Sequence, residues 1–525
     1  MATACASSSE AAPSVGDEEN VPKDEFIPRE YQVELFEAAM KENTIVCLGT
    51  GTGKTFIAVM LIKEYEAAIR IPFEEGGKRT FFLVPTVPLV VQQQKAIKCQ
   101  TDLRVGGYVG DMNVDNWNKQ RWEKEFIESQ VLVMTPDVFK LIIHHGFLKM
   151  SRVNLLILDE CHRAVKQHTY REVMRCMDVL KPEEKPRVLG LTASVINSKA
   201  TERQVERKVH DLEMALHSRV LTVSNQQSMA RYGTKPTEVL IEHHTTSSPS
   251  ICGIQVPALP NFRPTTSQGQ ELDRRLRSLI KVLHDMGVWC GHLAIEVIME
   301  EARRMLDGLD DDGVLREVEV CLEWLDDVRK RCRNHIAETN DTMSTPKLKR
   351  LLEILWAFRP REQQQAGSGD AAEEPVSLCG IIFVKERIVA RILRDWLREL
   401  ASRVPRYSYI VPEFIVGHGA NLQLGSKEAG MSFKRQCKVL EQFRRQECNL
   451  LVATSVVEEG MDVPKCSLVV RFDFPDDFRS YVQSKGRARA QRSLYVMMTA
   501  RDEYCKACMN LRNYLSIEAI LMNKC

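Results

Sequence analysis

Short runs of apolar, often β-branched residues alternate with longer amphipathic stretches along most of this chain. Such alternation is typical of βαβ units, in which a helix returns the chain to the next strand of a parallel sheet. The pattern predicts one parallel α/β domain over residues 24–235. Its expected strands lie at residues 44–48, 80–84, 131–134, 155–158 and 188–191.

A second series of apolar runs begins near residue 379 and predicts a second α/β domain over residues 346–500. The two domains share the coarse alternation of strands and helices, but we find no internal sequence repeat. The expected strands of the second domain lie at residues 380–384, 414–416, 450–453, 467–472 and 494–498.

The segment between the two domains has a different pattern. Residues 268–345 are rich in helix formers, and their leucines recur at spacings of three and four residues, which predicts an all-α insertion. The remaining segments are predicted as a disordered leader at 1–23, a Pro- and Ser-rich linker at 236–267, a mobile polar linker at 361–375, and one or two truncated helices at 501–525.

Composition places the chain among globular proteins of several domains. It has 525 residues, of which 44% are hydrophobic, and this content is too high for a disordered protein. Lys and Arg together number 72 against 71 Asp and Glu, so any site for a polyanion must be a local basic lining. Net charge therefore neither supports nor excludes a nucleic-acid partner.

The scattered cysteines indicate a reducing compartment, and the short apolar runs argue against a membrane span. The 16 cysteines are scattered, no apolar run approaches the roughly 20 residues of a membrane span, and the start of the chain lacks the pattern of a signal peptide. We expect a cytoplasmic protein without a membrane partner. Cys505 and Cys508 form one C-x-x-C pair, but two further ligands at a matching spacing are missing nearby, so no structural zinc is expected.

The strongest chemical signal is a glycine-rich loop, GTGTGKT at residues 49–55, between the first strand and a helix. In that context the backbone N–H groups surround phosphate oxygens and the helix N-terminus adds partial positive charge. Lys54 is expected to neutralise phosphates, and the Thr55 hydroxyl to bind Mg²⁺. The usual pattern has Gly where this chain has Leu48, which leaves an incidental glycine-rich turn as the alternative. The backbone of the site is expected from Gly51, Thr52 and Gly53.

Two adjacent carboxylates, Asp159 and Glu160, follow the apolar run at 155–158 and precede Cys161 and His162. The carboxyl end of a strand is where ligands bind in open α/β sheets. Asp159 is expected to hold Mg²⁺ through water, and Glu160 to orient and deprotonate the water that attacks a γ-phosphate. An Asp-Glu pair after a strand is often only structural, but its position after a phosphate loop favours catalysis.

The second α/β domain contains the basic segment QSKGRAR at residues 483–489 beside a strand end. Either Arg487 or Arg489 is a candidate arginine finger. The alternative is that this segment is only a solvent-exposed basic helix face without a catalytic function. Thr454 follows another buried strand and offers a hydroxyl to a phosphate, and Asp462 offers a carboxylate to a ribose.

Together these motifs resemble those of a superfamily 2 helicase from residue 26 to the end of the chain. The Asp-Glu-Cys-His box, the helical insertion and phrases such as NLLVATSVVEEG and SYVQSKGRARA are most similar to the helicase region of the Dicer family, with RIG-I-like RNA sensors as the next group. The resemblance implies two RecA-like parallel-sheet motor domains, ATP and Mg²⁺ as cofactors, and terminal helices that brace the motor domains. In this family an apolar residue at the position of Leu48 is usual.

The resemblance also implies functions for individual residues. Arg29 would stack on adenine, Gln32 would bind its edge, and Gln483 would contact the γ-phosphate region beside the two arginines. The implied RNA-contacting set is Pro85, Thr86, Thr135, Thr192, Ser194, Lys385 and Thr454, of which Thr192 and Ser194 also couple hydrolysis to domain movement.

The expected function is that of an ATP-dependent RNA helicase, stimulated by double-stranded RNA, that supports small-RNA production and antiviral RNA interference. Double-stranded-RNA-binding proteins are possible partners. We see no carboxylate cluster of the ribonuclease III type and expect no RNA cleavage by this chain. One alternative is an ATP-gated module that binds and discriminates duplex ends without unwinding, and another is a DNA translocase.

Overall fold

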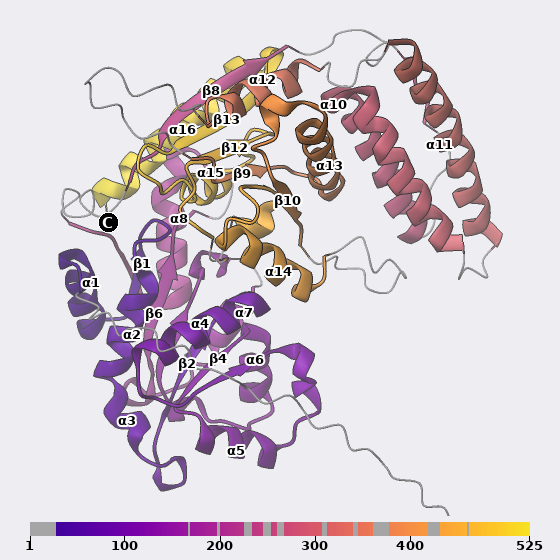
Figure 1. The fold of residues 1–525 in the computed structure, drawn as a ribbon. Coiled ribbons are helices and arrows are strands. Elements are labelled where there is room, and N and C mark those ends of the chain that lie inside the picture. The colour runs from indigo at the N-terminus through magenta and orange to yellow at the C-terminus, as the bar shows by residue number, and fades with distance from the viewer. Residues whose placement is uncertain are drawn as a thin grey trace, which may run out of the picture.

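The computed structural model describes two parallel α/β domains and a helical insertion (Figure 1). The residues that it describes are 28–165, 168–196, 200–224, 234–244, 254–259, 267–306, 312–339, 345–360, 377–417, 431–458, 461 and 463–524. The predicted leader at 1–23, the predicted linker at 361–375 and Asp462 lie outside these residues.

The first domain is built on a parallel sheet of seven strands among the described residues, in the order β3-β4-β2-β5-β6-β1-β7. Its central strands are almost fully buried, which explains why they are continuous apolar runs. The strands are β1 (Thr44–Cys47), β2 (Arg79–Leu83), β3 (Val105–Tyr108), β4 (Val131–Met134), β5 (Val153–Leu158), β6 (Arg187–Thr192) and β7 (Arg219–Leu221).

Helices follow the strands of this domain and place the carboxyl ends of the strands at one edge. They are α1 (Glu30–Lys41), α2 (Lys54–Glu64), α3 (Glu66–Arg70), α4 (Val87–Gln100), α5 (Lys119–Glu128), α6 (Pro136–His144), α7 (Thr169–Arg175) and α8 (Glu202–Leu216). The predicted strands of this domain are confirmed.

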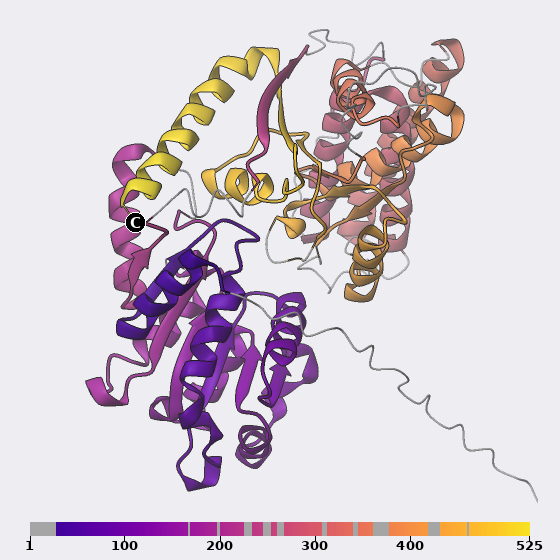
Figure 2. The same cartoon turned by 60° about the vertical axis from the view of Figure 1, so that its left-hand side comes forward.

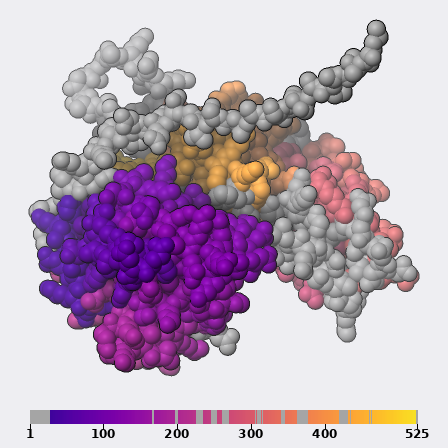
Figure 3. Space-filling view, turned by 90° about the horizontal axis from the view of Figure 1, so that it is seen from below, coloured from indigo at the N-terminus to yellow at the C-terminus, as the bar shows by residue number. Residues whose placement is uncertain are grey.

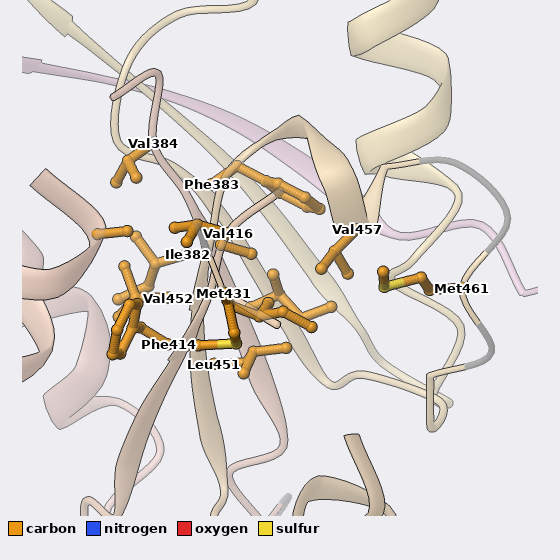
Figure 4. Packing of buried hydrophobic residues seen from close by; sticks show 14 of the residues in the cluster. Ile382, Phe383, Val384, Phe414, Val416, Met431, Leu451, Val452, Val457 and Met461 are labelled. Atoms are coloured by element: carbon orange, nitrogen blue, oxygen red, sulfur yellow. The ribbon is translucent and has the colours of Figure 1, made fainter. Parts of the chain in front are cut away.

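The second domain has a parallel sheet of six strands within the described ranges, in the order β10-β11-β9-β12-β13-β8. Side chains from β9 and β11 interleave in its core, and Val457 and Met461 lie at the edge of that core (Figure 4). The strands are β8 (Thr237–His243), β9 (Gly380–Phe383), β10 (Pro412–Ile415), β11 (Leu450–Ala453), β12 (Leu468–Arg471) and β13 (Leu494–Ala500). Its helices are α13 (Arg387–Arg403), α14 (Phe433–Arg444) and α15 (Phe478–Lys485).

Strand β8 corrects the predicted linker at 236–267. All seven of its residues pair with β13, so the chain enters the second sheet before it forms the insertion. The sequence TEVLIEH has only three apolar residues, at 239–241, between polar ones, and most of the strand is half-buried because it lies at the sheet edge. That mixed pattern, unlike the apolar runs of the central strands, explains why the sequence did not reveal it. The second domain therefore begins near residue 237 and not at residue 346.

The insertion consists of α10 (Ser267–Leu306) and α11 (Asp312–Thr339), which lie side by side next to α13 (Figure 1). The chain reverses direction within α10 at Gly287, whose φ of 86° and ψ of −179° are accessible to glycine and costly for other residues. Arg275 before this glycine therefore lies 3.4 Å from Glu301 after it. The chain then returns to the second domain through α12 (Pro346–Trp356). Seen from below, the insertion lies beside the second domain and the first domain lies in front (Figure 3).

Among the described residues, one helical stretch, Gly269–Arg304 in α10, is long and apolar enough to cross a membrane by length and composition. In its most apolar window, 67% of the residues are buried inside the protein, as in a core helix.

Helix α16 (Tyr504–Lys524) connects the two α/β domains (Figure 2). Asn513 Nδ2 donates to the carbonyl of Ala200, just before α8, at 2.8 Å. On the next residue, the ring of Tyr514 packs against Phe474, Phe478 and Tyr481 of the second domain. This single helix therefore contacts both domains, where one or two terminal helices were predicted.

A buried charge network fastens the insertion to the second domain. Lys347 Nζ, on α12, lies 2.9 Å from Asp285 of α10 and 3.2 Å from Asp473, just after β12. Lys281 of α10 lies 3.7 Å from the same Asp473, whose other oxygen accepts the Lys385 N–H at 3.2 Å. Burial alone would raise the pKa of Asp473, but Lys347 and Lys281 outweigh burial and lower that pKa to about 2. These ion pairs thus fix the insertion to the second domain.

Asp473→Asn should lower the free energy of unfolding by about 3 kcal/mol at neutral pH, because it leaves a buried lysine with one carboxylate fewer. The folded pKa lies below the value of about 3.9 expected in the unfolded chain, so this stabilisation is complete above that value and is lost as the pH falls towards about 2. Urea unfolding at neutral pH and at about pH 3 should show the difference from the unsubstituted protein shrinking. Arg350→Gln, in an exposed ion pair with Glu353, is the matched control. A difference that does not change with pH would contradict the assignment.

Candidate functional site

The glycine-rich loop connects β1 to α2, and Lys54 is the first residue of the helix. Its Nζ donates to the carbonyls of Leu48 at 2.9 Å and Gly49 at 3.1 Å, so the loop curves around the ammonium group. Burial lowers the pKa of Lys54, and the nearby carboxylates of Glu160 and Asp159 partly offset this effect. The structure therefore brings the lysine and both carboxylates together.

Leu48 has a structural function at the unusual position of the loop. Its side chain is 2% exposed, and its N–H donates to the Thr192 carbonyl of β6 at 3.1 Å. The residue thus extends the pairing of β1 with β6 and packs into the core. A buried apolar side chain at this position explains why glycine is not required there.

Residues at the start of α1 hold the loop from the other side. The Tyr31 hydroxyl donates to the Thr52 carbonyl at 2.8 Å, and Gln32 Nε2 donates to the same oxygen at 3.1 Å. Arg29 Nη1 donates to the Tyr31 hydroxyl at 2.8 Å. In this structure Gln32 therefore contacts the phosphate loop directly. The sequence predicted only a contact between Gln32 and the edge of adenine.

Asp159 and Glu160 follow β5 at the same edge of the sheet. Asp159 Oδ1 accepts the Glu160 N–H at 2.9 Å, and Oδ2 accepts from Gln93 Nε2 at 3.0 Å. Burial, with the neighbouring Glu160, raises the pKa of Asp159 to about 7 against the opposing effect of Lys54. Two adjacent buried carboxylates repel each other when both are charged, and a divalent cation bound beside them would offset that repulsion.

The residues present fit Mg²⁺. This ion prefers oxygen ligands and is usually held by one or two carboxylates together with phosphate oxygens and water. Asp159 and the Thr55 hydroxyl at the start of α2 are oxygen donors of this kind. In the part of the chain that the structure describes, no cluster of three or more His, Cys, Asp or Glu side chains offers a different metal site.

His162 connects the carboxylates to β6. Its Nδ1 lies 2.9 Å from the Thr192 hydroxyl and 3.3 Å from Glu160 Oε2. The Thr192 hydroxyl in turn donates to the Ser194 carbonyl at 2.7 Å and accepts the Ser194 N–H at 3.1 Å. Thr192 and Ser194 are buried, with exposures of 0% and 1%, so their placement differs from the predicted contact with RNA. Through His162, this segment is connected to Glu160.

The second domain meets the phosphate loop through the segment after α15. The Thr50 hydroxyl donates to the Gly486 carbonyl at 2.7 Å, and the same carbonyl accepts from Arg489 Nε at 2.7 Å. The Arg489 guanidinium lies so close to Gly51 that a Cβ there would be 2.6 Å from its central carbon. Arg489 therefore faces the phosphate loop across the domain boundary, and a side chain at position 51 would displace it.

Arg487 faces the interior of its own domain. Its Nη1 donates to the Met461 carbonyl at 2.7 Å and its Nη2 to the Glu458 carbonyl at 2.9 Å. The side chain is 4% exposed, and Gln483 is 1% exposed. Of the two arginines that the sequence left open, Arg487 is thus bonded within its own domain, whereas Arg489 faces the phosphate loop.

The other residues of the predicted RNA-contacting set separate into two groups. Pro85 and Thr86 follow β2 and Thr135 follows β4, and because these strands are parallel neighbours, the three residues lie at one sheet edge. Thr454 follows β11 but is buried. Lys385 donates to Asp476 at 2.7 Å and lines a cavity of about 420 Å³ between α8, α16 and the second domain.

Several residues of the site had no distinctive sequence signal. Gln93 binds Asp159 from the middle of α4, and the Tyr170 hydroxyl donates to the Asp159 carbonyl at 2.7 Å from α7. Thr50 was part of the loop motif, but its contact partner lies 436 positions away along the chain. Such residues become visible only when the fold brings distant segments together.

Comparisons with known proteins agree with this geometry. Residues 29–202 match the DEAD/DEAH box helicase family, and residues 413–491 match the helicase conserved C-terminal domain. The chain is 36% identical over 557 residues to Endoribonuclease Dicer of Gallus gallus, which covers 95% of this chain and 29% of that protein. It is 35% identical to Endoribonuclease dcr-1 of Caenorhabditis elegans, over 95% of this chain and 27% of that protein.

The chain therefore spans less than a third of the length of these relatives. Among solved structures, the Pyrococcus furiosus Hef helicase domain is similar over 92% of this chain and 98% of its own, at 22% identity and a TM-score of 0.49.

Thr192→Val should lower the free energy of unfolding by roughly 1–3 kcal/mol, because it leaves buried polar partners at His162 and Ser194 without the hydroxyl. Thr192→Ser keeps that hydroxyl and should cost clearly less. Urea unfolding of the two variants beside the unsubstituted protein measures both values. Equal losses for Val and Ser would show that the methyl group, and not the hydrogen bonds, carries the effect.

Proposed function

Because the chain carries a DEAD/DEAH box domain and a helicase C-terminal domain and is similar over nearly its whole length to Dicer proteins, we propose that it is a Dicer-type, ATP-dependent RNA helicase region stimulated by double-stranded RNA. The observation that carries the proposal is the contact of Thr50 with Gly486, beside Arg489 against Gly51. Each domain supplies part of one phosphate site. Hydrolysis should therefore require that the two domains meet.

The residues of the first domain would bind ATP and activate the attacking water. Lys54 would exchange its bonds to loop carbonyls for bonds to phosphate oxygens, and the N–H groups at the start of α2 would add to that binding. Glu160 would accept a proton from the attacking water. Mg²⁺, held by Asp159 and Thr55, would supply neutralisation of the phosphate charge. Arg29 and Gln32 would add adenine recognition beside their contacts with the loop.

Arg489 would stabilise the charge that develops in the transition state, because it already faces the loop from the other domain. Arg487 would keep Glu458 and Met461 in place through its bonds to their carbonyls. Gln483 would act from the same helix, inside the domain. We thus assign the arginine finger to Arg489.

RNA would bind along the sheet edge that carries Pro85, Thr86 and Thr135. Thr454, which is buried after β11, would support this surface from within the second domain. Threonine hydroxyls and the N–H groups of helix starts suit phosphates and 2′-hydroxyls, which predicts weak sequence preference and strong salt dependence. The insertion would help to encircle duplex RNA. Since the charge network around Asp473 fixes it to the second domain, it should move with that domain.

We further propose a cytoplasmic function in small-RNA production and antiviral RNA interference, together with double-stranded-RNA-binding proteins. RNA cleavage by this chain alone is not expected. An ATP-gated module that binds duplex ends without unwinding uses the same residues, and a strand-release assay beside the ATPase assay distinguishes the two.

ATP turnover by the purified chain should rise with blunt duplex RNA and much less with duplex DNA or single-stranded RNA at one fixed salt concentration. Lys54→Ala should abolish this turnover, because it removes the cation that neutralises the phosphates, while RNA binding measured by fluorescence anisotropy persists. Turnover that duplex DNA stimulates equally would favour a DNA translocase. Turnover that survives Lys54→Ala would remove the loop from the mechanism.

Arg489→Ala should slow ATP hydrolysis by roughly 10³-fold or more while ATP binding is retained, as expected for an arginine finger. Arg487→Ala should instead lower thermal stability, because it leaves buried carbonyls unpaired. Single-turnover kinetics and thermal melting of both variants separate the two effects. A catalytic loss confined to Arg487→Ala, with normal melting, would reverse the assignment.

A further inference from the structure

Lys485 directly precedes the carbonyl that contacts Thr50 and lies outside the catalytic set assigned above. Its ammonium sits between two carboxylates from distant parts of the chain: Nζ is 2.8 Å from Glu238 of β8 and 2.9 Å from Glu518 of α16. The Tyr481 hydroxyl, one turn earlier on α15, donates to Glu238 at 2.7 Å and accepts from Lys485 at 3.0 Å. We call Lys485, Glu238 and Glu518 the lysine clamp.

The surroundings of the clamp make its bonds strong and specific. The three charged side chains are only 20–24% exposed, so water screens them weakly. Burial alone would lower the pKa of Lys485, but Glu518 and Glu238 outweigh burial and raise it. The ammonium therefore stays charged and bound to both partners over the physiological pH range.

The lysine clamp is linked to the arginine finger through the backbone, because Lys485 is directly followed by Gly486. Lys485 is the last residue of α15, and the next residue, Gly486, supplies the carbonyl that accepts from both Thr50 and Arg489. A shift of Lys485 must therefore shift that carbonyl. Because Arg489 Nε is bonded to it at 2.7 Å, the direction of the guanidinium depends on the same anchor.

The other end of the clamp leads to the first domain. Glu518 lies on α16, five residues after Asn513, which donates to Ala200 of the first domain. Figures 1 and 2 both show α16 extending from the second domain to the neighbourhood of α8. Helix α16 thus touches the first domain and holds the segment that carries the finger.

We infer that Lys485, held by Glu238 and Glu518, is a positioning residue for ATP hydrolysis. It places Arg489 at the phosphate loop, and its own position depends on that of α16. The inference rests on the proposed ATPase function. Lys485 touches neither nucleotide nor water in this assignment and acts only through Gly486 and Arg489. Its loss should therefore affect the transition state more than the binding of ATP.

Lys485→Gln and Glu518→Gln test this directly. Each should lower kcat roughly 10- to 100-fold with little change in KM for ATP, because misplacement of a catalytic group reduces transition-state stabilisation and not ground-state binding. Each should also weaken binding of ADP with aluminium fluoride, a transition-state mimic, by a similar factor. The double variant should be no slower than the slower single variant, because both changes release the same anchor.

Arg512→Gln removes an exposed charge from the same helix and is the matched control, with kcat expected unchanged. Thermal melting confirms that each variant is folded. Unchanged kcat in folded Lys485→Gln and Glu518→Gln, or a rise in KM alone, would overturn the positioning function while Lys54-dependent turnover of the unsubstituted protein still supports the ATPase. Absence of that turnover would instead overturn the ATPase function and this inference with it.

Discussion

The organisation of this protein depends on one contact between domains, the hydrogen bond from the Thr50 hydroxyl to the Gly486 carbonyl. It joins the loop that can hold phosphate to the segment that carries Arg489. Neither domain alone places a lysine, two carboxylates and an arginine around one point. The catalytic arrangement is therefore a property of the relative position of the domains, and every element that controls this position also controls the chemistry.

Two further connections set which parts move together. The charges around Asp473 fasten the insertion to the second domain, whereas α16 contacts both domains. The insertion and the second domain thus behave as one unit, and the first domain is the other. Inside the first domain, His162 lies between Glu160 and Thr192, so the carboxylate that follows β5 is connected to β6.

Much of this could be predicted from the sequence because the relevant signals are local. Buried central strands are apolar runs, and the phosphate loop and the Asp159-Glu160 pair are contiguous motifs that follow such runs. The edge strand β8 was missed because its apolar run is only three residues long and is flanked by polar residues. The separate functions of Arg487 and Arg489 could not be resolved either. The two arginines are two residues apart in the same basic segment, and only the fold shows that one binds Met461 and Glu458 while the other meets Gly51.

The kink at Gly287 divides α10 into two arms with different attachments. The arm before it carries Lys281 and Asp285, which are held at the second domain, and the arm after it packs along α11. The second arm is about 28 Å long at 1.5 Å per residue. This arm folds back along the first arm, because Arg275 before the glycine lies 3.4 Å from Glu301 after it. One residue without a side chain therefore lets the chain reverse direction within the insertion, so that the two arms of α10 pack side by side and the second arm reaches α11.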